Sequence, residues 1–211
     1  KTFFFTAINL LILNSLSFSQ ALWESQTSGV TDTLHGVYFY DDNTGWAVGS
    51  DGTILKTTNG GTDWNTQTSG VSDTSFYSVH AFDANTVWAV GNNGKILNTT
   101  DGGTNWSTQT SGVTDTSFNS VFAFDANTVW TVGDSGKILN TTDGGTNWST
   151  QTSSVTDTLY SVYFNDANNG WVVGSSGKII TTANGGTNWT AQTSGTSEGL
   201  RGIFFTNPDS G

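Results

Sequence analysis

The chain has 211 residues, a formal net charge of −11 at pH 7 and only 11% charged residues. A chain this acidic lacks the positive surface that binding to DNA, RNA or an anionic membrane requires. It contains 26 glycines and nine tryptophans but no cysteine. The lack of cysteine excludes disulfides, thiolate metal ligands and a cysteine nucleophile.

Residues 1–19 have the layout of a secretory signal peptide, because Lys1 precedes an apolar stretch that ends in small residues. A transmembrane helix is the alternative reading. It needs about 20 apolar residues, and Asn9 and Asn14 interrupt this stretch. We therefore expect residues 1–19 to be cleaved and the mature chain not to insert into a membrane. The expected location is secreted, periplasmic or at the cell surface.

The rest of the chain repeats itself about every 42 residues. The eleven residues ILNTTDGGTNW occupy 96–106 and again 138–148. All nine tryptophans fall into two series with spacings of 41 or 42 residues: Trp46, Trp88, Trp130 and Trp171, and Trp23, Trp64, Trp106, Trp148 and Trp189. A period of this length is typical of propeller blades or of helical arrays.

The residue pattern inside each repeat favours strands over helices. Residues 118–153 contain the β-rich runs SVFAF, VWTVG, KILNT and NWSTQT, separated by turn residues. The dipeptides DG, NG and SG at 51–52, 93–94 and 135–136 predict type I′ hairpin turns, whose central residues need positive φ. Four antiparallel strands in each repeat predict an all-β protein, a β-propeller of four-stranded antiparallel blades.

The repeat predicts four complete blades, at about 35–69, 77–111, 119–153 and 160–194. The first strand of each is apolar on both faces, as in Val79–Phe82, so we expect burial on both sides. Residues 201–211 match the start of a partial fifth blade. We therefore expect residues 20–211 to be a C-terminally truncated propeller. Residues 21–28 match a fourth strand and are expected to close the ring.

The motif T-x-[DN]-x-G-x-x-W occurs once in each complete repeat. It resembles the Asp-box, or BNR repeat, a hairpin signature of certain β-propellers. The resemblance implies a structural turn in which the Asp or Asn side chain caps backbone N–H groups and the Trp packs beneath the hairpin. The sixteen positions are Thr57, Asn59, Gly61, Trp64, Thr99, Asp101, Gly103, Trp106, Thr141, Asp143, Gly145, Trp148, Thr182, Asn184, Gly186 and Trp189.

The longer phrase GWAVG..G.IL.TT.GG..W resembles the photosystem II stability/assembly factor-like propellers over residues 23–211. Relatives of that family include many exported bacterial proteins. Members that assist photosystem assembly carry an arginine-rich patch for their partner. This chain has a single arginine, Arg201.

Catalytic residues are not expected. Asp-boxes also occur in sialidases, but sialidase chemistry needs an arginine cluster. Glycosidases need a pair of carboxylates facing the substrate, whereas ten of the 15 aspartates occupy repeat-equivalent positions typical of turns. The two histidines, His35 and His80, are too few for a catalytic triad or a histidine metal site. We predict no catalytic residue, no metal and no cofactor.

The positions that differ between repeats are the candidates for binding. The first strands begin with His35, Tyr77, Asn119, Tyr160 and Arg201, which we expect to line the mouth of a central channel. Such side chains suit contacts with a peptide or glycan, although drift at tolerant surface positions is the other reading. The leading hypothesis is an exported, non-enzymatic interaction or assembly scaffold that binds a protein, peptide or glycan at the propeller face. The alternative is a glycan-binding or sialidase-type propeller whose active site lies in missing blades.

Overall fold

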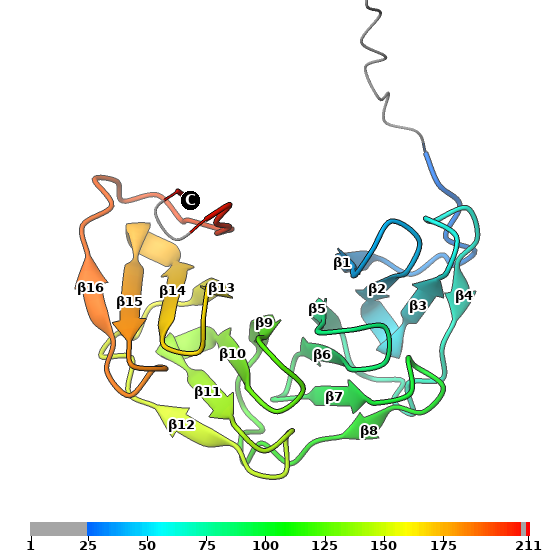
Figure 1. Cartoon of the computed structure of the whole chain (residues 1–211), viewed down its shortest axis with the longest axis horizontal. Helices are drawn as coiled ribbons and strands as arrows, with labels where there is room; N and C mark the ends of the chain where they lie inside the picture. Colours follow the sequence, from blue (N-terminus) through cyan, green and yellow to red (C-terminus); the bar gives the residue numbers. More distant parts are fainter. Residues whose placement is uncertain (1–24, 208–209) are drawn as a thin grey trace, which may run out of the picture.

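The computed structural model describes residues 25–207 and 210–211, so the predicted signal peptide lies outside the described residues. Within them, sixteen strands form four separate four-stranded sheets. The sheets stand side by side around an arc, with β1, β5, β9 and β13 innermost (Figure 1). The predicted all-β propeller of four-stranded antiparallel blades is confirmed.

Each blade is a simple antiparallel meander in chain order. Blade one has β1 (Leu34–Phe39), β2 (Gly45–Gly49), β3 (Ile54–Thr57) and β4 (Asn65–Thr66). Blade two has β5 (Phe76–Ala81), β6 (Val87–Gly91), β7 (Ile96–Thr99) and β8 (Ser107–Thr108). Blade three has β9 (Phe118–Ala123), β10 (Val129–Gly133), β11 (Ile138–Thr141) and β12 (Ser149–Gln151). Blade four has β13 (Leu159–Phe164), β14 (Asn169–Gly174), β15 (Ile179–Ala183) and β16 (Thr190–Gln192).

The turn between the second and third strands follows the predicted chemistry. In blade one, the Thr53 N–H donates to the Ser50 carbonyl at 3.0 Å. The two residues between them, Asp51 and Gly52, have φ of 55° and 75°. The equivalent residues of the other three blades also have positive φ. Positive φ at both central positions is what a type I′ turn requires, and it sends the third strand back along the second.

The hydrophobic core lies between blades rather than within them. One cluster joins Trp88, Val90 and Ile96 of blade two to Phe118 and Val121 of blade three. The other two clusters join blades one and two and blades three and four through equivalent residues. We call the side of a blade that carries the Trp–Val–Ile set its forward face, and the opposite side its backward face. Stacking of forward on backward faces is therefore what holds the arc together.

The first strands are buried on one side only, so the expectation of burial on both sides is wrong. Val79 and Ala81 are 6% and 1% exposed in the core, but His80 is only half-buried and Phe82 is 38% exposed. The reason is the curvature of the arc. Alternate side chains of these innermost strands point to the central channel, where the rings of neighbouring inner strands cover them only in part.

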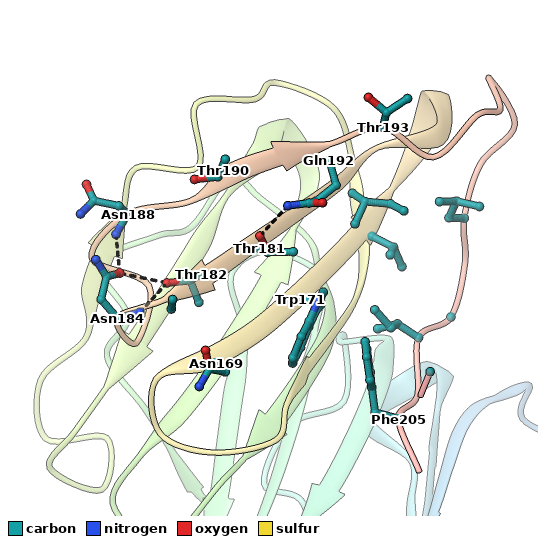
Figure 2. Close-up of a pocket in the computed structure, with 17 residues that line it drawn as sticks. Asn169, Trp171, Thr181, Thr182, Asn184, Asn188, Thr190, Gln192, Thr193 and Phe205 are labelled. Atoms are coloured by element: carbon teal, nitrogen blue, oxygen red, sulfur yellow. Dashed lines mark hydrogen bonds between the residues drawn. The ribbon is translucent and has the colours of Figure 1, made fainter. Parts of the chain in front are cut away.

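The two ends of the arc differ from its interior. Val37, on the backward face of blade one, is 62% exposed, whereas its equivalents Val79, Val121 and Val162 are 4–6% exposed. At the other end, residues 200–205 run beside blade four, and the Phe205 ring lies 4.3 Å from that of Trp171 (Figure 2).

In the described part of the chain, no helix has the length and hydropathy needed to cross a membrane.

Candidate binding site at the central channel

The box turns use their own polar groups. In blade two, the Thr99 hydroxyl accepts from the Gly103 N–H at 2.9 Å and donates to Asp101 Oδ1 at 2.8 Å. Asp101 also accepts from the Asn105 side chain at 2.7 Å and from the Asn105 N–H at 2.9 Å. These hydrogen bonds, the Asn105 side chain first, lower the pKa of Asp101 to about 2. The same turn recurs in blades one, three and four, where Asn59, Asp143 and Asn184 take the place of Asp101.

The box tryptophans of blades one and four hydrogen-bond to the preceding part of the chain, whereas the indole N–H groups of Trp106 and Trp148 are buried without a hydrogen-bond partner. Trp189 Nε1 donates to Gln151 Oε1 at 3.2 Å, and Gln151 Nε2 donates to the Gly185 carbonyl at 3.1 Å. Gln151 ends the outermost strand of blade three, so the box of blade four fastens that strand. Gln26 makes the same pair of hydrogen bonds to Trp64 and the Gly60 carbonyl of blade one. The box residues therefore have a structural role in the fold.

The five predicted mouth residues occupy equivalent positions of the repeat, and four of them contact one another in pairs. His35 and Asn119 also reach the hairpins between second and third strands, at Ser50 and Asp134. The His35 and Tyr77 rings are 5.5 Å apart, edge to face. The Arg201 guanidinium lies 4.8 Å from the centre of the Tyr160 ring. Asn119 differs from the other four, because its side chain donates to the Leu159 carbonyl at 3.0 Å and to Asp134 Oδ1 at 3.2 Å. Asn119 therefore also ties blade three to blade four.

The wall of the channel carries an aromatic series that the sequence pattern had not singled out. Tyr38, His80, Phe122, Tyr163 and Phe204 follow one another at the repeat spacing, and we call them the aromatic ladder. Successive ring centres are 4.3, 4.8, 5.3 and 5.8 Å apart. The ladder lines a cavity of about 650 Å³, together with Ser78, Ser120 and Ser161. The sequence signal that could have revealed the ladder is a ring-bearing residue at the equivalent position of all five repeats.

The polar groups of the wall connect one inner strand to the next. The Ser78 hydroxyl accepts from the Val121 N–H at 3.3 Å, and His80 Nδ1 accepts from the Ala123 N–H at 3.3 Å. Burial lowers the pKa of His80 to about 4, so the ring is neutral at pH 7 and Nδ1 is free to accept. The wall therefore offers uncharged rings and hydroxyls to a ligand.

Within the described residues, no group of three or more His, Asp or Glu side chains is placed to hold a metal ion. The channel combines aromatic rings, hydroxyls, an amide and one guanidinium. This composition suits non-covalent recognition, in which rings supply contact area and polar groups fix orientation.

Comparison with known proteins agrees with this architecture. The family model described as "Photosynthesis system II assembly factor YCF48" matches residues 16–151 and 148–206. The chain belongs to the YCF48 family. The resemblance to photosystem II assembly factor-like propellers, stated from the repeat phrase, is confirmed. A search among curated proteins gave no match.

Two solved YCF48 structures are similar to this chain over most of its length. A structure titled "YCF48 bound to D1 peptide" has 30% identity and a TM-score of 0.71, covering 89% of this chain and 62% of that one. YCF48 from Cyanidioschyzon merolae has 25% identity and a TM-score of 0.63, covering 83% and 61%. This chain thus spans about three fifths of the length of the YCF48 chains that it matches.

More distant structures share the fold alone. The GH74 enzyme from Niastella koreensis has 16% identity and a TM-score of 0.61, covering 75% of this chain and 30% of that one. An ancestral GH74 enzyme has 18% identity and a TM-score of 0.60, covering 79% and 25%. At these identities the likeness carries no argument for glycan chemistry.

Proposed function

We propose that this YCF48-family chain is a non-enzymatic assembly scaffold that binds an extended peptide segment of a protein partner in its central channel. The observation that carries the proposal is the similarity, at 30% identity over 89% of this chain, to a YCF48 structure bound to a D1 peptide. A glycan ligand or a glycosidase activity would need support that the distant GH74 likeness does not supply.

The channel supports a peptide ligand by its chemistry. The ladder rings give contact area at low cost in side-chain entropy, which is why aromatic residues are enriched in binding surfaces. At the mouth, exposed His35 and Arg201 flank the half-buried Tyr77 and Tyr160. These side chains hydrogen-bond to peptide amides and carbonyls, while the ladder holds an apolar side chain of the ligand.

The charge of the chain constrains the peptide. The chain has a net charge of −11, with 17 acidic residues against six basic ones. Mutual repulsion therefore disfavours a strongly acidic ligand. We propose a neutral or basic segment with an apolar or aromatic residue for the ladder.

Export is a separate part of the proposal, supported by the signal-peptide pattern of residues 1–19. N-terminal sequencing of the protein recovered from cell fractions tests it. A mature N-terminus near Gln20 in the exported fraction is the expected result. An uncleaved chain in the cytoplasm would contradict it.

Peptide binding is tested by selecting ligands from a displayed random peptide library, with a synthetic D1 peptide as a defined probe. We expect enriched peptides to bind the chain and to lose binding on Tyr77→Ala/Tyr160→Ala. Thr100→Ala, at an exposed position beside the blade-two box, is the matched control and is expected to bind normally. Failure to enrich any peptide, with saturable binding on a glycan array, would favour the glycan alternative.

A further inference from the structure

The first strand of each blade is an edge of its sheet and lies innermost in the arc (Figure 1). In β9, two backbone N–H groups donate to side chains of blade two. The Val121 N–H donates to the Ser78 hydroxyl and the Ala123 N–H donates to His80 Nδ1, each at 3.3 Å. Side chains of the preceding blade therefore cap these edge donors. A capped edge is protected from pairing with another chain.

The serine cap recurs one blade further along the chain and is missing one blade earlier. The Val162 N–H of β13 donates to the Ser120 hydroxyl at 3.3 Å. In blade one, the position equivalent to Ser78 and Ser120 is Gly36, which has no side chain to accept a hydrogen bond. Among the described strands β5, β9 and β13, the serine cap is therefore absent from β5.

The donor without this cap is the N–H of Val79, the residue equivalent to Val121. Val79 lies opposite Ala89 in the register of β5 and β6, as Val121 lies opposite Thr131 in that of β9 and β10. The Val79 N–H therefore has the same direction as that of Val121, away from the second strand of its blade. Within the part of the chain that the structure describes, no side chain accepts from it. Val79 also lines the cavity of the central channel, where a ligand can reach it.

We propose that an extended peptide in the channel adds to the inner edge of β5, with one of its backbone carbonyl groups accepting from the Val79 N–H beside Gly36. The inference rests on the proposed function and specifies the strand and the backbone group that hold the ligand. Addition to a sheet edge is a common mode of peptide recognition, in which main-chain hydrogen bonds give affinity. The ligand carbonyl takes the part that the Ser78 hydroxyl has at Val121.

Amide hydrogen exchange of the unliganded chain, followed by NMR, tests the missing cap without a ligand. We expect the Val79 N–H to exchange about tenfold or more faster than the capped N–H groups of Val121 and Val162. Exchange of Val79 as slow as that of Val121 would overturn the proposal. This comparison uses the unaltered chain, so it decides the matter whether or not a variant at position 36 folds.

Gly36→Ser supplies the hydroxyl that the following blades have and should slow the exchange of the Val79 N–H. A Cβ at position 36 would lie 2.9 Å from the Tyr77 carbonyl oxygen, so any side chain there crowds β5. Gly36→Ala is therefore the matched variant, because it adds the same Cβ without the hydroxyl. We expect Gly36→Ala to slow the exchange less than Gly36→Ser does. Circular dichroism establishes that each variant is folded.

The ligand is tested with the tightest peptide selected from the displayed library, by fluorescence anisotropy and by exchange. We expect the peptide to slow the exchange of Val79, and Gly36→Ser to weaken its affinity about three- to tenfold more than Gly36→Ala does. Thr100→Ala should bind normally. A peptide that binds but leaves Val79 exchange unchanged, with equal affinities for the two Gly36 variants, would overturn the anchor on β5 and leave the proposed function standing. Failure of every peptide to bind would overturn both.

Discussion

The box turns and the channel mouth both lie at strand ends, yet the repeats treat them in opposite ways. At the box, four blades use the same threonine hydroxyl to hold the same glycine N–H at 2.9 Å. At the mouth, equivalent positions carry His35, Tyr77, Asn119, Tyr160 and Arg201. Repetition therefore marks the residues that the fold requires, and we propose that variation marks positions available to a partner.

The contacts explain the difference. A box side chain bonds to the backbone of its own turn, so another residue type would leave buried N–H groups without an acceptor. The rings of His35 and Tyr77, and the side chains of Tyr160 and Arg201, contact one another. Their loss removes surface contacts and leaves the turn intact. Substitutions at repeated and at varying positions should therefore differ in their cost to stability, and we expect the largest cost inside the arc.

Trp130→Ala tests the interior of the arc, where every blade needs a large buried ring. Trp130 is 1% exposed and its ring is stacked on that of Phe164 at 3.6 Å. Removing a buried Trp leaves a large cavity, so we expect the free energy of unfolding to fall by about 3–5 kcal/mol. Denaturant unfolding measures this loss, with Trp130→Phe as a milder control. A loss below about 1 kcal/mol would contradict forward-on-backward packing as the source of stability.

Thr99→Ala tests the box. Thr99 is 2% exposed, and its loss leaves the buried Gly103 N–H without its acceptor. We expect a loss of about 1–3 kcal/mol in unfolding free energy. Thr99→Ser keeps the hydroxyl and should recover most of the loss. The exposed neighbour variant Thr100→Ala should change stability by less than about 0.5 kcal/mol. Equal losses of stability in Thr99→Ala and Thr100→Ala would contradict a structural role of the box.

The pH dependence of stability tests the wall of the channel. His80 has a folded-state pKa of about 4, below its ordinary value of 6.5, because burial disfavours the charged ring. The unfolded chain therefore binds the proton first, and the stabilising effect of the neutral ring is lost as the pH falls from about 6.5 to about 4. The rings of Tyr38 and Phe122 flank His80, and neither carries charge in this range.

We expect the thermal midpoint to decline as the pH falls through that window. His80→Phe, which introduces the residue that blade three has at the equivalent position, should make the decline smaller. Thermal melts at half-unit pH steps measure it. The box carboxylate Asp101 has a pKa of about 2, so its stabilising effect is lost as the pH falls from about 3.8 through 2. Asp101 therefore does not add to the decline in stability between pH 6.5 and 4. An unchanged decline in His80→Phe would assign the pH dependence to other groups.

Much of the fold could be predicted from the sequence, because its determinants are local. The positive φ at Asp51 and Gly52 follows from turn chemistry, and the blade pattern follows from the spacing of tryptophans. The aromatic ladder could not be predicted in the same way. Val79 and His80 both read as buried, and only the curvature of the arc decides that His80 faces the channel.

Side-chain contacts between neighbouring blades also could not be predicted from the sequence pattern. The pairing of His35 with Tyr77 and of Tyr160 with Arg201 depends on how closely successive inner strands approach. The same holds for Trp171. Its local sequence, GWVVG, differs from the GWAVG around the buried Trp46 at one residue, but Trp171 lies half-buried because it stands at the end of the arc.

The central proposal is that the mouth residues Tyr77 and Tyr160 bind a partner and contribute little to the stability of the fold. The most direct measurement compares Tyr77→Ala/Tyr160→Ala with the unaltered chain, in affinity for a library-selected peptide and in denaturant unfolding. We predict that affinity falls about tenfold or more, while the unfolding free energy changes by less than about 1 kcal/mol. Unchanged affinity, or a loss of affinity that merely follows a loss of folded protein, would contradict the account.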